Sequence, residues 1–318
     1  MARFAHTDLD VFPLALGGNV FGWTADEDAS FAILDAFHAG GGNLIDTADA
    51  YSAWAPGHVG GESERIIGAW LASRNHTGVT VATKVSQHPQ FPGLSAGNVR
   101  AAAEASLDRL GVEAIDLYFA HFDDPATPLE ETVAAFGQLV QDGLVRYTAV
   151  SNYTAERIRE WVRIARELGV AEPVAIQPHY NLVHRETEND IVPLAAELGI
   201  GLVPYFSLAR GFLTGKYRST DAAGDGHTSP RADAAAQYAT PQGLQILEVL
   251  ERIGDAHGVS IAATALAWLR AKPTVVAPIA SASKLTQVPD LLAGATTDLT
   301  ADEVARLDAV SEWTPSDM

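Results

Sequence analysis

Short apolar runs alternate with segments of helical spacing along most of the chain. The apolar runs cover residues 14–18, 43–48, 79–85, 115–121, 147–152, 174–177, 201–205 and 275–280. Each is nearly continuous in apolar residues, which is typical of strands that are buried on both faces. We therefore predict eight strands in a parallel sheet.

Between these runs, apolar residues recur every three or four positions, which is the spacing of one buried helix face. Segments 129–140 and 158–168 show this spacing clearly, and Gly143 and Gly169 follow them. Glycine is common just after the last helical turn, so these positions indicate helix ends. Segment 300–303, Thr-Ala-Asp-Glu, has the spacing of a capping box and predicts the start of a last helix.

Eight strands that alternate with helices over 318 residues predict one (β/α)8 TIM barrel, a single domain over residues 1–318. A doubly wound sheet is the alternative, and it would usually carry a G-x-G-x-x-G motif after its first strand. The sequence Leu16-Gly17-Gly18-Asn19 does not match that motif. Residues 218–242 are rich in small and polar residues, and we expect a long irregular loop there.

The chain is strongly acidic, and this narrows the classes of partner. It has 21 Lys and Arg against 40 Asp and Glu, a formal net charge of −19. Such a charge repels nucleic acid and anionic membrane surfaces, so a small-molecule substrate is the expected partner. With no cysteine, disulfides, zinc–thiolate sites and cysteine nucleophiles are excluded. No apolar run approaches the roughly 18 residues of a membrane span, so we expect a soluble, cytoplasmic protein.

Four ionisable residues stand at or just after the ends of consecutive predicted strands: Asp46, Tyr51, Lys84 and His121. Each alone has an ordinary structural explanation, such as a turn aspartate, a packed tyrosine, a solvated lysine or a core histidine. In a barrel, however, the carboxyl ends of the strands meet at one face, where active sites are built. The four residues together therefore predict a shared pocket that carries chemistry.

Motifs along nearly the whole chain resemble the aldo-keto reductase family. They are the segments 43–51, 61–68, 82–84, 116–121, 150–152, 177–181 and 208–216. The resemblance implies an oxidoreductase that reduces an aldehyde or ketone, with Asp46, Tyr51, Lys84 and His121 as its catalytic residues. Tyr51 would donate the proton, and we expect Lys84 to lower its pKa. Asp46 would hold the ammonium, and His121 would orient the carbonyl.

The resemblance also implies a nicotinamide cofactor, NADP in preference to NAD. The implied cofactor-binding residues are Asn19, Asp46, Ser151, Asn152, Gln177, Tyr205, Ser207, Leu208, Arg210, Gly211, Lys216, Arg231, Ser283, Lys284 and Gln287. Segment 210–231 is locally cationic in this acidic chain, which suits a polyanionic ligand. Residues 218–242 would form a lid over the cofactor. Leu291 stands where the family often has Asn, so the adenosine end departs from the common pattern.

Four aromatic residues near the catalytic strands, Phe21, Trp23, Trp54 and Phe122, are candidates for the substrate pocket, although loop aromatics often just pack. Aliphatic or aryl aldehydes, steroid-like ketones, keto-sugars and pyridoxal remain open as substrates. A cofactor-binding, redox-sensing subunit similar to potassium-channel β-subunits is one alternative function. A metal-dependent lyase or isomerase is another, but Asp46 and His121 with a lysine between them make a poor metal site, so no metal is expected.

Overall fold

The structure is a computed structural model that describes residues 1–74, 77–219 and 230–312. Its centre is a parallel sheet of eight strands, in the order β11-β10-β9-β8-β5-β4-β3-β12. The strands are β3 (Ala15–Gly17), β4 (Leu44–Asp46), β5 (Thr80–Val85), β8 (Ile115–Ala120), β9 (Val145–Ser151), β10 (Ala175–Gln177), β11 (Gly201–Leu202) and β12 (Ile279–Ala280). Strands that are consecutive along the chain are therefore neighbours in the sheet, and the last strand, β12, pairs with the first, β3.

The sheet closes on itself between its two outer strands. Leu202 of β11 forms a parallel bridge with Val275. The Leu202 N–H donates to the Thr274 carbonyl at 2.8 Å, and the Val276 N–H donates to the Leu202 carbonyl at 2.9 Å. The fold is thus a (β/α)8 barrel, as predicted, and the doubly wound alternative is wrong.

Every predicted apolar run overlaps one strand of the barrel, although β9 begins two residues before its run, and β11 and β12 each cover only two residues of their runs. Each of these runs contains a proline, Pro204 and Pro278, which has no N–H to donate to a neighbouring strand. Single bonds continue the pairing on the far side, such as the 2.8 Å bond from the Ile279 N–H to the Pro204 carbonyl. Regular ladders therefore form over only part of these two runs.

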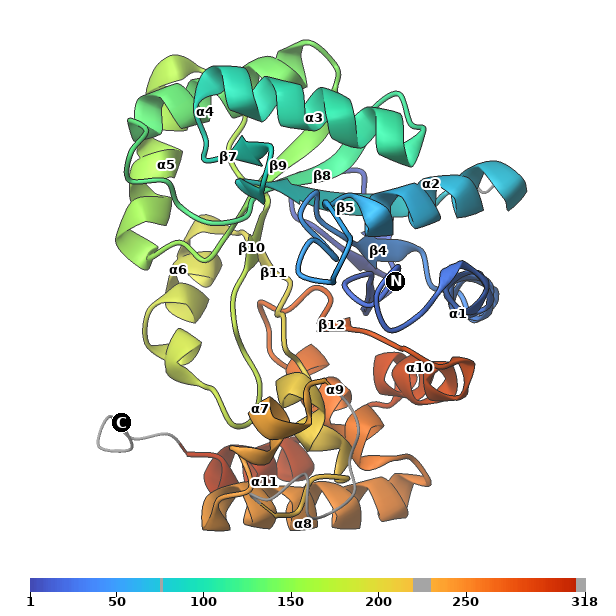
Figure 1. Ribbon diagram of the computed structural model, residues 1–318. Helices are drawn as coiled ribbons and strands as arrows, with labels where there is room; N and C mark the ends of the chain where they lie inside the picture. Colours follow the sequence, from blue (N-terminus) through green and yellow to red (C-terminus); the bar gives the residue numbers. More distant parts are fainter. Residues whose placement is uncertain (75–76, 220–229, 313–318) are drawn as a thin grey trace.

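Helices surround the barrel on the outside (Figure 1). They are α1 (Glu27–Ala39), α2 (Glu62–Arg74), α3 (Ala96–Leu110), α4 (Leu129–Gln141), α5 (Ala155–Leu168), α6 (Ile191–Leu198), α7 (Ala232–Ala236), α8 (Pro241–His257), α9 (Ile261–Arg270), α10 (Val288–Thr296) and α11 (Ala301–Val310). The predicted capping box at Thr300 and Glu303 is confirmed, and Gly169 ends α5 in the left-handed conformation. Within the described residues, no helix is long and apolar enough to cross a membrane.

Two short hairpins were not predicted. The first pairs β1 (Ala2–Arg3) with β2 (Asp10–Val11), and the second pairs β6 (Gln87–His88) with β7 (Phe91–Pro92). Phe4, Leu9 and Val11 of the first hairpin pack into the same apolar cluster as the inward-facing barrel residues. The hairpin therefore covers the amino-terminal end of the barrel and leaves the carboxyl end open.

The expected irregular loop at 218–242 is only partly borne out. Residues 220–229 lie outside the described residues, whereas α7 covers Ala232–Ala236 and α8 begins at Pro241. The prediction of irregular structure was wrong for α7, because its sequence is mostly alanine, the strongest helix former. The α7 alanines are buried against Phe212, which anchors this end of the segment.

Candidate active site

The alternation of side chains along the strands places polar groups at the open end of the barrel. Leu44 of β4 and Ala82 of β5 belong to the apolar cluster inside the barrel. Successive inward-facing residues are two positions apart, so the next ones are Asp46 and Lys84. Both are almost completely buried, at 2% and 0% exposure. The strands thus change from an apolar interior to an ionic site within two residues.

The Lys84 ammonium forms the centre of this site. Its Nζ donates to Asp46 Oδ2 at 2.8 Å, to the Thr47 carbonyl at 2.6 Å and to the Tyr51 hydroxyl at 2.9 Å. An ammonium has three N–H donors, so all of them are used. Gln177 Nε2 donates to the other Asp46 oxygen at 2.8 Å. These extra bonds compensate for the removal of a lysine–carboxylate pair from water.

The pKa of Tyr51 differs from the prediction. Burial raises it to about 12, while the nearby Lys84 lowers it and Asp46 raises it. Lys84 therefore acts in the expected direction, but the expectation of a net lowered pKa was wrong, because removal of the phenol from water outweighs the lysine charge. The hydroxyl keeps its proton at neutral pH, as a proton donor must.

His121 follows β8, and its ring meets that of Tyr51 edge to face, with the two centroids 6.0 Å apart. Burial lowers the pKa of His121 well below its ordinary value, and Lys84 lowers it further. The imidazole is therefore uncharged, with one donor and one acceptor nitrogen. A neutral ring of this kind can hydrogen-bond a carbonyl oxygen beside Tyr51.

A cavity of about 960 Å³ opens above these residues. Of the residues predicted for the site, it is lined by Asn19, Trp23, Asp46, Tyr51, Trp54, His121, Phe122, Ser151, Asn152, Gln177, Tyr205, Ser207, Leu208, Arg210, Gly211, Lys216, Arg231, Ser283, Lys284 and Gln287. Lys84 does not line it, but reaches it through its bond to Tyr51. One face of the barrel thus brings together nearly all predicted site residues.

Phe21 is the exception and requires a correction. It is fully buried and packs in an apolar cluster with Ile33 of α1 and Ile66 of α2. A turn bonds the Phe21 N–H to the Gly18 carbonyl at 3.0 Å, and the ring lies under the helices instead of in the cavity. Its role is core packing, so the prediction of a substrate-pocket residue was wrong.

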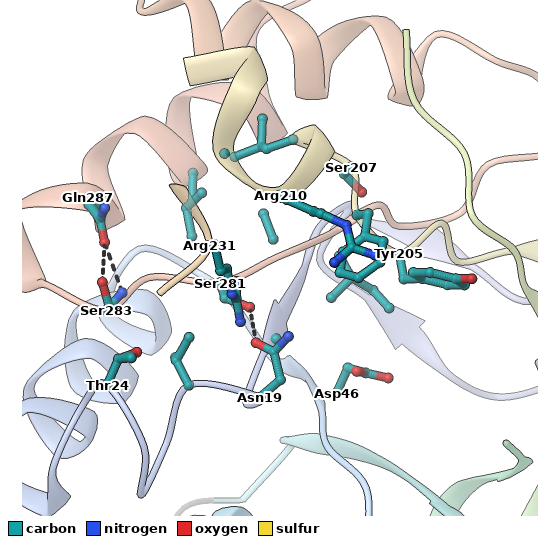
Figure 2. A pocket seen from close by; sticks show the side chains of 18 of the residues that line it. Asn19, Thr24, Asp46, Tyr205, Ser207, Arg210, Arg231, Ser281, Ser283 and Gln287 are labelled. Atoms are coloured by element: carbon teal, nitrogen blue, oxygen red, sulfur yellow. Dashed lines mark hydrogen bonds between the residues drawn. The ribbon is translucent and has the colours of Figure 1, made fainter. Parts of the chain in front are cut away.

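A hydrogen-bonded set of polar groups lines one end of the cavity. Asn152 Nδ2 donates to the His121 carbonyl at 2.9 Å and to Ser151 Oγ at 3.0 Å. The Tyr205 hydroxyl donates to Asn152 Oδ1 at 2.8 Å, which fixes the Tyr205 ring at the cavity wall. Figure 2 shows Tyr205 beside Arg210 at this end. A flat ring and fixed amide groups in one place fit a nicotinamide and its carboxamide.

The other end of the cavity carries Ser283 and Gln287, far from Tyr205 in Figure 2. The Ser283 N–H donates to Gln287 Oε1 at 2.8 Å, and Lys284 is exposed beside them. Between the two ends, the Arg210 guanidinium lies 4.3 Å from the Phe206 ring centroid, and that of Arg231 lies 5.4 Å from the Trp23 centroid. An elongated cavity with cations along its length fits a dinucleotide phosphate.

Several lining residues were not among those predicted, notably Ser260, Ser281 and Asp290. Ser281 Oγ donates to Asn19 Oδ1 at 2.7 Å (Figure 2), which joins the loops after the first and last barrel strands. Ser260 is the N-cap of α9, a role that its sequence context signals, but only the closed barrel brings that helix end to the cavity. Within the described residues, no three metal-ligating side chains cluster.

Comparison with known proteins agrees with this geometry. The Aldo/keto reductase family model matches residues 13–312. Aldo-keto reductase str7 of Strobilurus tenacellus is 31% identical over 92% of this chain and 84% of its own length. A probable voltage-gated potassium channel subunit beta of Oryza sativa is 31% identical over 98% of this chain and 97% of its own. The uncharacterized oxidoreductase YrpG of Bacillus subtilis is 33% identical over 90% and 88%, respectively. The barrel, the site at its open end and these matches show that the chain belongs to the aldo-keto reductase family.

Proposed function

We propose that Tyr51 is the proton donor of an NADPH-preferring carbonyl reduction. As a family member, the chain is an NAD(P)H-dependent oxidoreductase that converts an aldehyde or ketone to an alcohol. The observation that supports Tyr51 most is its position: its hydroxyl faces the cavity and lies 2.9 Å from the buried Lys84 ammonium. Proton donation to the developing alkoxide is general acid catalysis, worth about 10²- to 10⁴-fold in rate.

The neighbours of Tyr51 have separate roles in this proposal. Lys84 stabilises the negative charge that Tyr51 acquires as it gives up its proton. Asp46 holds Lys84 in place through their 2.8 Å ion pair. His121, uncharged, orients the substrate carbonyl toward the Tyr51 hydroxyl by a hydrogen bond.

The polar end of the cavity would hold the nicotinamide, which supplies the hydride when bound. We assign the carboxamide contacts to Ser151, Asn152 and Gln177, and ring stacking to Tyr205. Asn19 and Asp46 complete this end. The phosphate contacts fall to Ser207, Leu208, Arg210, Gly211 and Lys216, and the adenosine end to Ser283, Lys284 and Gln287. Fixed donors of this kind orient the ring without reorganisation during the reaction.

Preference for NADPH rests on two cations of the cavity lining, one at the adenosine end and one between the two ends. Lys284 and Arg231 both line the cavity and can pair with the 2′-phosphate that NADH lacks. Asp290 lines the same cavity and would oppose that phosphate, so the preference depends on the two cations. The lid role of residues 218–242 and a cytoplasmic location remain predictions.

The substrate side is lined by aromatic rings. Trp23 and Trp54 meet edge to face with their centroids 5.6 Å apart, and Trp54 is 51% exposed at the cavity. Phe122 lies beside His121 and is 40% exposed. We propose these three rings as the contacts for a largely apolar carbonyl compound, because aromatic side chains bind flat apolar groups.

A redox-sensing subunit with little turnover is the second candidate. It is favoured by the similarity to a protein named as a probable potassium channel subunit beta. Such a subunit would bind the cofactor tightly but reduce carbonyls slowly.

One assay tests both candidates. NADPH oxidation is measured against a panel of aliphatic, aryl, steroid-like and sugar carbonyls, and repeated with NADH. We expect turnover with NADPH and weaker use of NADH. Replacing Lys284 and Arg231 with Ala should weaken the binding of NADPH by about 1–3 kcal/mol per lost charged contact. The binding of NADH should be nearly unchanged. Tight cofactor binding without turnover of any carbonyl would favour the sensor. A native preference for NADH would contradict the cofactor proposal.

A further inference from the structure

A second buried polar cluster lies behind the proposed catalytic lysine, on the side away from the cavity. It consists of Asp49, Glu64 of α2, Arg109 of α3 and Tyr118 of β8. Asp49 lies in the loop that connects Asp46 to Tyr51, and its backbone N–H donates to the Lys84 carbonyl at 3.2 Å. The cluster is therefore attached to the segment that carries the proton donor.

The hydrogen bonds of this cluster leave Asp49 out. Glu64 Oε1 accepts from Thr83 Oγ1, and Glu64 Oε2 accepts from Arg109 Nε, each at 2.6 Å. Both Asp49 carboxyl oxygens are buried and accept no side-chain hydrogen bond from the described residues, while the adjacent Ala50 amide favours their charged form. Lys84 cannot serve Asp49, because its three donors are already used by Asp46, Thr47 and Tyr51.

Charge balance then decides the state of Asp49. Lys84 pairs with Asp46, and Arg109 pairs with Glu64. A charged Asp49 would be a third carboxylate, fully buried and without a cationic partner of its own, which is strongly unfavourable. Burial raises the pKa of Asp49 well above its ordinary value, and Glu64 raises it further, whereas Arg109, the Ala50 amide and Lys84 lower it.

We propose that Asp49 is a positioning residue that acts as an uncharged acid. While it keeps its proton, Asp46 is the carboxylate that balances Lys84, and the lysine charge can stabilise the anionic form of Tyr51. When Asp49 ionises, its negative charge offsets part of the positive charge of Lys84. The anionic form of Tyr51 is then less stabilised, so Tyr51 becomes a weaker acid. Burial raises the pKa of Tyr118 and Asp49 raises it further, and the buried Tyr118 hydroxyl has no hydrogen-bond partner among the described residues. The His88 ring and the Asp49 carbonyl both lie close to Gly60. This inference rests on the proposed role of Tyr51.

The test follows Asp49 directly in the intact enzyme. Protein labelled with ¹³C at the aspartate side-chain carboxyl is titrated by NMR, and the resonance that disappears in Asp49→Asn is assigned to Asp49. We expect this resonance to be that of a protonated acid at neutral pH and to titrate well above the exposed aspartates. Asp298→Asn is the matched control, because the Asp298 side chain is 90% exposed.

Steady-state reduction rates over the same pH range supply the functional readout. In the wild type, kcat should fall as Asp49 loses its proton, and Asp49→Asn should lack this step. Across this pH range, the ratio of the Asp49→Asn rate to the wild-type rate should rise by roughly threefold or more. This is the scale of effect that one nearby charge has on a general acid. The Asp298→Asn profile should follow the wild type. A merely structural role for Asp49 would not move the pH profile.

Two results would overturn the proposal. One is an Asp49 resonance that is already a carboxylate at neutral pH. The other is a pair of wild-type and Asp49→Asn rate profiles that superimpose up to about pH 10. If Asp49→Asn does not fold, Glu64→Gln replaces it: removing the neighbouring carboxylate must lower the midpoint of the late-titrating resonance, and an unmoved midpoint contradicts the inference. Failure of the Tyr51 proposal is distinguishable, because it leaves the NMR result unchanged.

Discussion

At the scale of single residues, the hydroxyl of Tyr51 is the atom on which the proposed reaction depends. Tyr51→Phe removes the proton donor but keeps the ring, so kcat should fall by about 10²-fold or more while NADPH affinity hardly changes. Steady-state kinetics and a cofactor titration measure both. Tyr153→Phe is a matched control, because the Tyr153 hydroxyl is buried, away from the cavity lining, and has no partner among the described residues. Wild-type turnover by Tyr51→Phe would remove Tyr51 from this role.

A second prediction at this scale concerns the effect of the Lys84 charge on Tyr51. Lys84→Met removes a charge that lowers the pKa of Tyr51, so that pKa should rise and the alkaline limb of the pH–rate profile should move to higher pH. Most activity should be lost. Asp46 would be left as a buried, unpaired carboxylate, at a cost of about 3–5 kcal/mol in unfolding free energy. The double variant with Asp46→Asn should recover part of this stability in urea unfolding. A folded Lys84→Met with an unshifted profile would contradict the coupling.

At the scale of elements, one end of the barrel contributes to stability, whereas the other end holds the proposed active site. The β1–β2 hairpin buries Phe4 completely at the closed end, opposite the cavity. Phe4→Ala should cost about 3–5 kcal/mol in unfolding free energy, measured by denaturant titration, with kcat and KM unchanged at a temperature where the variant is folded. Arg3→Ala, which removes an exposed ion pair with Asp10, should change the unfolding free energy far less than Phe4→Ala, because exposed ion pairs contribute little. A large change in KM for Phe4→Ala would show that the hairpin communicates with the site.

At the scale of the whole molecule, two charge effects oppose each other. The net charge of −19 repels an anionic cofactor, whereas Arg210, Lys216, Arg231 and Lys284 line its proposed site. Charges beyond about 10 Å are largely screened at moderate salt, so the local cations should dominate. NADPH binding should therefore weaken as ionic strength rises, as measured by fluorescence titration in increasing salt. Binding that strengthens with salt would mean that the overall charge dominates.

The amino-acid sequence was enough to predict the eight barrel strands and most of the residues that line the cavity. The apolar runs predicted all eight strands, since burial on both faces is visible in local composition. The residues at their carboxyl ends predicted a shared pocket, because a parallel barrel brings those ends together. The burial and the neighbours of each side chain could be known only from the tertiary structure. In the folded chain, Phe21 packs under the helices, and Ser260 and Ser281 line the cavity. Burial raises the pKa of Tyr51. The fold also buries the Asp49 carboxyl without a side-chain hydrogen-bond partner among the described residues. Each of these depends on contacts between segments far apart along the chain, and those contacts exist only once the barrel has closed.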